Sequence, residues 1–297
     1  MIGNMVGKVA VITGANSGIG FETARGVAQL GATVVMVCRD EARGSAARDA
    51  VAKVDGGAVP VLLLADLLEQ VQVRRLASDL RVRFSQIDVL INNAGAAFPK
   101  RGVTGDGIER TFAVNHLAPF LLTNLVIDLL QAAPHARVIN ISSDLHASKI
   151  DFDDLNLERK YTWVRAYALS KLANILFTKE FARRFAGSHV TANCLEPGPA
   201  VSHFGRGAGG TLSVVSRLLQ AAAFLGVAGS TRDGARTPIY LASSPDVAKT
   251  TGKYFRRCRE VRAKPITDDV DTAKRLWQIS EQLCDGLRGI GASDWSR

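Results

Sequence analysis

The chain has 297 residues, of which 47% are hydrophobic and 22% are charged, so it has ample apolar material for a globular core. Its formal net charge is +9, but the basic residues are scattered apart from a cluster between residues 256 and 264, and aromatic residues make up only 6%. The sequence therefore lacks the interleaved basic and aromatic side chains that grip nucleic acid strands, and we expect no nucleic acid partner.

Short runs rich in β-branched residues alternate with longer stretches whose apolar residues recur at helical spacing. Strands are predicted at residues 9–13, 33–38, 59–65, 89–92, 138–142 and 190–195, with a weaker seventh at 253–255. Helical patterns fall between them, at residues 22–30, 42–54, 71–84, 108–132 and 167–185. This alternation predicts a doubly wound α/β fold of the Rossmann type, with a mostly parallel seven-stranded sheet covered by helices on both faces. With neither repeat nor linker, residues 1–297 are predicted to form a single domain.

Two regions depart from the alternation. Residues 197–230 are rich in Gly, Ala and Ser and contain one apolar helical stretch at 212–225, which is typical of a substrate-binding lid. The alternative is an apolar patch used for dimer contacts. Residues 268–288 have a polar and apolar helical pattern that predicts a C-terminal helix packed on the body.

A glycine-rich turn joins the first predicted strand to the first helix. Such a turn lets the backbone approach a pyrophosphate, while the helix N-terminus offers free N–H groups and a partial positive charge. The strand before it and the helix after it make a dinucleotide site more specific than a lone glycine cluster would. The candidate cofactor-binding residues are Gly14, Asn16, Ser17, Gly18, Ile19 and Gly20.

The end of the second strand indicates which dinucleotide binds. Folds that bind NAD usually place Asp or Glu there for the ribose 2′-OH, whereas Arg accommodates a 2′-phosphate. Cys38 takes the place of the acid and Arg39 follows it, so NADP(H) is favoured over NAD(H). Asp40 comes one residue later and can cap the next helix instead.

More polar residues follow the third and fourth strands. Asp66, with Leu67 beside it, comes directly after the third strand and is a candidate for contacting adenine. Asn93, Ala94 and Gly95 follow the fourth. The carboxyl ends of strands form the edge where open α/β sheets bind ligands, so these residues are candidates for cofactor contacts.

Tyr167 and Lys171 are four residues apart in a helical pattern, so they share one helix face. A nearby cation favours phenolate, which would let Tyr167 exchange a proton with a carbonyl or alcohol near neutral pH. Tyr161 and Arg165 have the same spacing without other support. Ser142 and Ser143 follow the fifth strand, where a hydroxyl can bind a substrate oxygen.

The remaining composition argues against other kinds of site. Cys38, Cys194, Cys258 and Cys284 lie far apart without metal-ligand spacing, so no metal site is expected. No apolar run reaches the roughly 18–20 residues of a membrane-spanning helix. The first residues lack the layout of a signal peptide. We therefore expect a soluble, cytoplasmic protein.

Taken together, these residues resemble the short-chain dehydrogenase/reductase family in its compact single-domain branch. The matching motifs run from the glycine turn at 13–20 through Asn-Asn-Ala-Gly at 92–95 to Tyr-x-x-x-Lys at 167–171 and Pro-Gly at 197–198. The runs at 114–117, 120–123, 170–178 and 252–255 are similar to retinol dehydrogenases, as is the separation of 24 residues between Ser143 and Tyr167 (167 − 143).

The resemblance implies a role for each matching residue. Tyr167 would be the catalytic acid/base, Lys171 would tune it and bind the nicotinamide ribose, and Ser143 would orient the substrate oxygen. Spacing alone favours a buried core amide for Asn115, whereas the resemblance makes it a catalytic residue that holds a water linking Lys171 to solvent. Pro197, Gly198 and Ser202 would bind the cofactor, with Ser202 standing where the family usually has Thr.

The subgroup implies NADP(H) and a lipophilic carbonyl or alcohol, such as a retinoid-like aldehyde, as ligands. It also allows a homodimer, although it includes monomers. A catalytically silent, NADP(H)-sensing regulatory protein on the same fold is the alternative, because a fold does not fix a function. Such a protein needs the phosphate turn but neither Tyr167 nor Lys171.

Overall fold

The structure is a computed structural model, and it describes residues 2–54, 58–198 and 230–284. The predicted lid at 197–230, its apolar stretch and Ser202 therefore lie outside the described residues, apart from Pro197, Gly198 and Ser230. The described residues contain every predicted strand. They also contain all the candidate site residues except Ser202.

The strands form one eight-stranded sheet in the order β3-β2-β1-β4-β5-β6-β7-β8. Seven strands are parallel, and only β8 runs antiparallel to its neighbour. The fold class predicted from the sequence is confirmed, with one strand more than expected. The strands are β1 (Val9–Thr13), β2 (Thr33–Cys38), β3 (Val61–Leu64), β4 (Val89–Asn92), β5 (Ala136–Ile141), β6 (Val190–Glu196), β7 (Tyr254–Arg256) and β8 (Arg259–Glu260).

The eighth strand was not predicted because its turn carries no recognisable hairpin sequence. Arg257 and Cys258 connect β7 to β8, and both have positive φ, at 48° and 60°. Tight hairpin turns with two such residues usually contain Asn-Gly or Asp-Gly, which adopt this conformation at low cost. Arg-Cys has no such preference, so the sequence gives no signal for the turn.

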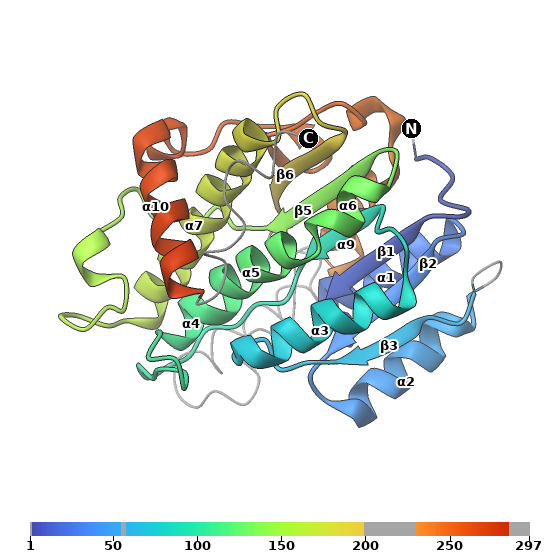
Figure 1. Cartoon of the computed structure of the whole chain (residues 1–297), viewed down its shortest axis with the longest axis horizontal. Coiled ribbons are helices and arrows are strands. Elements are labelled where there is room, and N and C mark those ends of the chain that lie inside the picture. Colours follow the sequence, from blue (N-terminus) through green and yellow to red (C-terminus); the bar gives the residue numbers. More distant parts are fainter. Residues whose placement is uncertain (1, 55–57, 199–229, 285–297) are drawn as a thin grey trace.

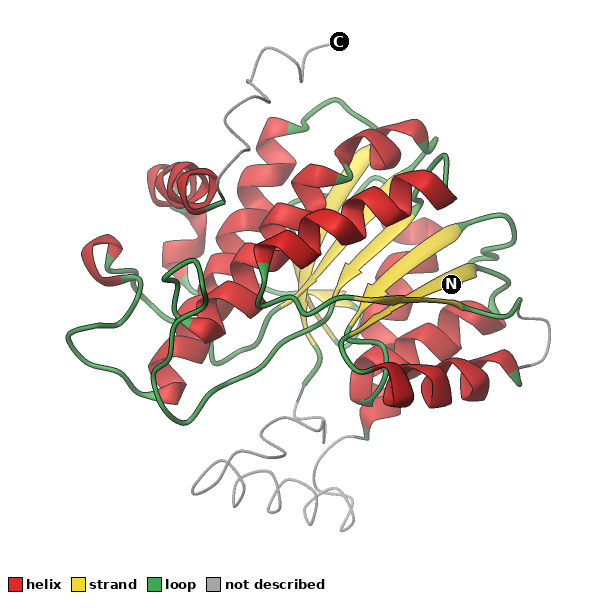
Figure 2. Cartoon of the chain, turned by 60° about the horizontal axis from the view of Figure 1, so that its bottom comes forward, coloured by secondary structure: helices red, strands yellow, loops and turns green. Residues whose placement is uncertain are grey.

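Helices cover both faces of the sheet (Figures 1 and 2). One apolar core lies between the sheet and α3, α5, α7 and α10, and a second lies between the sheet and α1, α2 and α9. These two cores explain why the central strands are apolar along their whole length. The helices are α1 (Gly18–Gln29), α2 (Glu41–Ala52), α3 (Gln70–Arg83), α4 (Arg110–Phe112), α5 (Ala118–Leu125), α6 (Ile127–Ala132), α7 (Trp163–Arg184), α9 (Thr231–Ser243) and α10 (Val270–Leu283).

The prediction of one continuous helix over residues 108–132 is wrong. The chain forms α4, then a π-helical turn over Ala113–Leu117, then α5 and α6. Pro119 lies just after the π-helical turn and has no N–H to give to the carbonyl of Asn115, four residues earlier. The regular helical ladder is therefore interrupted beside one of the candidate catalytic residues, as π-helical turns at functional sites often are.

Helix α9 was not predicted either. Ser230 and Asp233 form a reciprocal capping box at its start, and this pattern is visible in the sequence. Pro238 lies inside the helix and obscured the helical pattern.

Helix α10 lies within the range predicted for a C-terminal helix and ends at Leu283, while the residues from 285 onward lie outside the description. Trp277 packs edge-on against Phe120 of α5, with ring centres 4.9 Å apart, and lies 5.7 Å from the ring of Phe177 in α7. The guanidinium of Arg184 covers the indole at 4.4 Å. The helix thus closes the core over α5 and α7 (Figure 1).

Replacing Trp277 with Ala should lower the free energy of unfolding by about 3 kcal/mol or more, because it opens a cavity against two aromatic rings. Trp163→Ala is the matched control, since Trp163 is only partly buried at the start of α7. Chemical denaturation of both variants measures the difference. Equal losses would show that α10 is not a structural part of the core.

Candidate active site

The glycine turn between β1 and α1 requires glycine at particular positions. Gly14 and Gly18 have φ of +67° and +60°, which side chains disfavour. A Cβ on Gly14 would lie 2.9 Å from the Cα of Ala94, and one on Gly20 would lie 2.4 Å from both the Nδ2 of Asn93 and the carbonyl oxygen of Gly14. The turn is therefore pressed against the loop that follows β4.

Hydrogen bonds fix these two loops to each other. The hydroxyl of Thr13 accepts from the backbone N–H groups of Asn93 and Ala94, both at 3.0 Å. The amide of Asn93 donates to the carbonyl of Thr13 at 2.8 Å. The side chain of Asn93 thus braces the turn. Thr13, which was not among the predicted site residues, supplies the matching hydroxyl.

The residues at this turn fit a dinucleotide. Ser17 precedes α1 but its side chain does not cap the helix, and the first helical turn has no acidic residue. The N-terminal N–H groups of α1 therefore point toward the glycine turn without a side-chain acceptor, as an anion-binding helix end requires. Asn16, Ser17 and Ile19 are all partly exposed there.

At the end of β2, the structure separates the roles of three neighbouring residues. Cys38 is buried in the core, where burial raises the pKa of its thiol to about 11. Asp40 caps α2 by accepting from the N–H of Arg43 at 2.8 Å. The side chain of Arg39 is 67% exposed and lies 4.0 Å from Asp66. Arg39 is thus left facing solvent at the ligand-binding edge.

Asp66 and Leu67 lie at the neighbouring carboxyl end of β3. One carboxylate oxygen of Asp66 accepts from the N–H of Leu68 at 3.1 Å, and the backbone N–H of Asp66 donates to Gln72 at 2.9 Å. Leu67 packs partly buried against the core. The Asp66 loop is therefore fixed, and its second carboxylate oxygen faces Arg39.

Ser143, Tyr167 and Lys171 come together where β5 ends beside α7. The hydroxyl of Ser143 hydrogen-bonds the phenol of Tyr167. The ammonium of Lys171 lies 5.4 Å from the centre of the Tyr167 ring and donates to the carbonyl of Ile141 at 3.0 Å. Ser142 is buried and donates to the backbone carbonyl of Lys171 at 2.7 Å, so it holds α7 in place. This geometry separates the roles of the two serines, which spacing alone could not do.

The expectation that a nearby cation favours phenolate at Tyr167 is wrong for the described residues. Burial raises the pKa of the phenol to about 12, although the hydrogen bond from Ser143 opposes this shift. Burial also lowers the pKa of Lys171 to about 8. The ammonium is directed at the Ile141 carbonyl, so it does not offset the loss of solvent around the phenol.

Asn115 is fully buried within the π-helical turn. Its carbonyl oxygen accepts from the N–H of Ala96 at 2.8 Å, and its amide donates to the Ala96 carbonyl at 3.0 Å and to the hydroxyl of Ser170 at 2.9 Å. A Cβ on Gly95 would lie 3.2 Å from Asn115 and 3.6 Å from the ammonium of Lys171. Asn115 therefore fastens the loop after β4 to α7, within the candidate site.

The Tyr161–Arg165 pair has a structural role. Tyr161 donates to the carbonyl of Phe98 at 2.6 Å, and Arg165 donates to the carbonyl of Lys160 at 2.6 Å. The two side chains each bind a backbone oxygen and do not form a second site. Pro197 and Gly198 directly follow β6 at the same edge as Tyr167, and Gly198 has φ of +79°.

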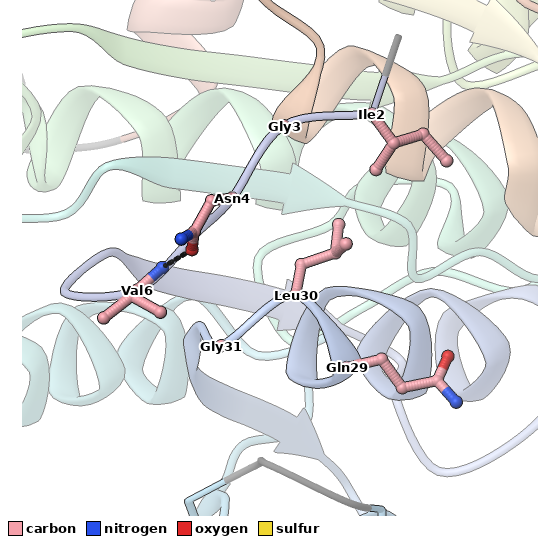
Figure 3. Close-up of a pocket in the computed structure, with 7 residues that line it drawn as sticks. All are labelled: Ile2, Gly3, Asn4, Val6, Gln29, Leu30 and Gly31. Atoms are coloured by element: carbon pink, nitrogen blue, oxygen red, sulfur yellow. Dashed lines mark hydrogen bonds between the residues drawn. The ribbon is translucent and has the colours of Figure 1, made fainter.

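A shallow hollow of about 400 Å³ lies at the opposite edge of the sheet (Figure 3). Its lining comes from residues that precede β1 and β2, so it faces the amino ends of these strands and not the candidate site. Among the described residues, no group of three or more His, Cys, Asp or Glu side chains could hold a metal ion. No helix within residues 2–54, 58–198 and 230–284 is long and apolar enough to cross a membrane. The residues around the hollow are Ile2, Gly3, Asn4, Val6, Gln29, Leu30 and Gly31.

Comparison with known proteins gives the family. The sequence profile of the short chain dehydrogenases matches residues 8–208, which include the glycine turn and the Tyr167–Lys171 pair. The chain belongs to the short chain dehydrogenase family. This short chain dehydrogenase is 41% identical to retinol dehydrogenase 14 of Mus musculus over 297 residues, which covers 96% of the chain and 88% of that protein.

Two solved structures are also similar to this short chain dehydrogenase. An uncharacterized protein from Mycobacterium paratuberculosis is 32% identical, with a TM-score of 0.75 and 95% of both chains covered. The RhlG/NADP active-site complex of Pseudomonas aeruginosa is 26% identical, with a TM-score of 0.69 and with 85% of this chain and 95% of that chain covered. The predicted resemblance to retinol dehydrogenase-like members of this oxidoreductase family is confirmed.

The glycine turn offers a direct test of the cofactor site. Gly20→Ala should weaken binding of a nicotinamide dinucleotide by about tenfold or more, because its Cβ would displace the Asn93 amide or the Gly14 carbonyl at the glycine turn. Gly105→Ala is the control, because the nearest atom to its Cβ is 4.0 Å away. Fluorescence titration with NADPH measures both, and equal affinities would contradict the assignment.

Proposed function

We propose that this short chain dehydrogenase transfers a hydride between NADP(H) and a lipophilic aldehyde or ketone, or the corresponding alcohol. The observation that carries the proposal is the Tyr167 phenol, which is hydrogen-bonded to Ser143 and lies next to Lys171, close to the loop that follows β4. The raised pKa keeps this phenol protonated at neutral pH. It is therefore in the form that can donate a proton to a carbonyl.

The nicotinamide of the cofactor, when bound, supplies or accepts the hydride. In reduction, Tyr167 gives its proton to the carbonyl oxygen and becomes phenolate, and in the reverse oxidation that phenolate takes the proton from the alcohol. Ser143 donates a second hydrogen bond to the same oxygen, which stabilises the negative charge that develops there. Both hydroxyls lie at the carboxyl edge of the sheet, where ligands of this fold bind.

Lys171 and Asn115 would support the proton transfer. The pKa of Lys171 is lowered to about 8, so the ammonium can exchange a proton near neutral pH. The side chain of Asn115 is already bonded to Ala96 and Ser170. We therefore assign the binding of a water near Lys171 to the backbone carbonyl of Asn115, which Pro119 leaves without its α-helical partner.

The preference for NADP(H) rests on Arg39. Its guanidinium is exposed at the end of β2, and Asp40, the acid nearest in sequence, is engaged in capping α2. A guanidinium pairs with a 2′-phosphate through two parallel hydrogen bonds. The similarity to a Pseudomonas aeruginosa protein solved with NADP supports the same choice. Asp66 would contact the adenine, and Pro197, Gly198 and Ser202 would line the nicotinamide end.

A lipophilic substrate is supported by similarity and by the surface next to Ser143. The relatives include a retinol dehydrogenase, and Leu145, two residues after Ser143, is 59% exposed. We also propose that residues 197–230 form the lid of this pocket, from their apolar composition. An apolar pocket strengthens the hydrogen bonds to the reacting oxygen because it excludes water.

Tyr167→Phe should lower kcat for NADPH-dependent aldehyde reduction by about 10²–10⁴-fold, because it removes the proton donor. Tyr161→Phe removes one hydroxyl from the structural pair and should leave kcat nearly unchanged. Steady-state assays with a panel of apolar aldehydes measure both. If Tyr167→Phe is as active as the wild type, the phenol is not the acid, and if no carbonyl is turned over at all, the silent regulatory protein is the better account.

Arg39→Ala should lower kcat/KM for NADPH by about 10–100-fold, because a charge-assisted hydrogen bond to the 2′-phosphate is lost. The value for NADH should stay nearly constant. Arg48→Ala is the control, since Arg48 pairs with Asp49 on the exposed side of α2. A wild-type enzyme that prefers NADH would overturn the choice of cofactor.

A further inference from the structure

His146 lies three residues after Ser143 and takes part in none of the roles described so far. It is buried, with an exposed fraction of 4%, in the connection between β5 and α7. Its ring packs edge-on against Tyr254 of β7, with ring centres 5.8 Å apart. A histidine buried this close to a catalytic hydroxyl needs a partner for each ring nitrogen.

Both ring nitrogens have one. Nδ1 lies 2.8 Å from the carbonyl oxygen of Ser143, and Nε2 accepts from the backbone N–H of Lys264 at 3.1 Å. The backbone N–H of His146 donates to the same Ser143 carbonyl at 3.3 Å. A carbonyl can only accept and an amide N–H can only donate, so these partners require a neutral ring with its proton on Nδ1.

The ring thus joins two parts of the chain that are far apart in sequence. On one side it closes the turn that begins at Ser143. On the other it holds Lys264, which precedes a short 3₁₀ helix (Pro265–Asp268) leading into α10. Lys264 also donates from its ammonium to the backbone carbonyl of His146. The position of Ser143 therefore depends on a segment more than a hundred residues away.

We infer that His146 is a positioning residue, which in its neutral form clamps the Ser143 turn to Lys264 and so keeps the Ser143 hydroxyl directed at Tyr167. The inference rests on the proposed function, because Ser143 and Tyr167 are its catalytic pair. The clamp makes the position of the Ser143 hydroxyl depend on His146 and Lys264, neither of which belongs to that pair.

The hydrogen bond between His146 and Lys264 should weaken as the pH falls, because protonation removes the acceptor on Nε2. Burial lowers the pKa of His146 below its usual 6.5, against the opposing effect of the hydrogen bond to Ser143. Neutral histidine therefore persists at neutral pH, and the clamp is lost only as pH falls through this lowered pKa. Protonation would place an N–H against the Lys264 N–H. The charged and titratable groups facing the ring are Asp144 from its own loop, Lys264 from the segment before α10 and Tyr254 from β7.

Lys264 allows the key bond to be removed without touching the site. Its φ is −63°, which proline adopts, so Lys264→Pro deletes the N–H that His146 accepts. Lys264→Ala is the matched control, because it also loses the ammonium but keeps the N–H. We expect kcat to fall about tenfold in Lys264→Pro relative to Lys264→Ala, with KM for NADPH unchanged, because small displacements of a catalytic group are costly.

Variants of His146 separate positioning from simple stability. His146→Gln keeps a side-chain acceptor that can reach the Lys264 N–H and does not titrate, so it should retain most of kcat without the loss of activity at acid pH that we expect of the wild type. His146→Phe keeps the packing against Tyr254 but loses both hydrogen bonds, so its kcat should fall at every pH. A purely structural role would lower the melting temperature of both variants and leave kcat of the folded enzyme unchanged, which would overturn the inference.

Nitrogen NMR of the histidine rings tests the clamp without any activity, and the chain has only five histidines. We expect the ring of His146 to be neutral with its proton on Nδ1, and to lose its Nε2 hydrogen bond in Lys264→Pro but keep it in Lys264→Ala. A charged His146 ring, or a proton on the Nε2 of that ring, at neutral pH would overturn the inference. If the NMR result holds but no carbonyl is reduced, it is the proposed function that fails.

Discussion

A buried ammonium organises this site. Lys171 is 3% exposed, and a charge so far from water needs acceptors that the fold must supply. The carbonyl of Ile141, at the end of β5, is its acceptor, and it also accepts from the amide of Asn174 one turn further along α7. These bonds fix α7 against the end of β5. Because Tyr167 lies one turn before Lys171, they also fix the phenol.

Side-chain hydrogen bonds also hold the two loops near Tyr167 and Lys171, which are the glycine turn and the loop after β4. Asn115 joins the loop after β4 to α7 through Ala96 and Ser170, and Thr13 joins the same loop to the glycine turn. The glycine turn and α7 are thereby connected through a single loop, in which a Cβ on Gly95 would lie 3.2 Å from Asn115 and 3.6 Å from the ammonium of Lys171. A rigid link of this kind keeps the two ends of a dinucleotide site in register for hydride transfer.

Much of this could be predicted from the sequence because it depends on local patterns. Apolar runs separated by helical periodicity gave the parallel sheet, and the spacing of Tyr167 and Lys171 placed both on one face of α7. The π-helical turn at Asn115 was missed because its cause, Pro119, lies within an otherwise helical pattern. The chemical state of Tyr167 was also missed, since burial depends on tertiary packing and outweighs a cation four residues away. The bracing role of Asn93 and the partners of His146 likewise come from residues distant in sequence.

We propose that this short chain dehydrogenase moves a hydride from NADPH to an apolar carbonyl with Tyr167 as the acid. Following the hydride itself tests this most directly. With NADPH carrying deuterium at the transferring position of the nicotinamide and an apolar aldehyde as substrate, mass spectrometry should find deuterium on the carbinol carbon of the alcohol product. An alcohol without deuterium, or no alcohol in the presence of bound NADPH, would contradict the account.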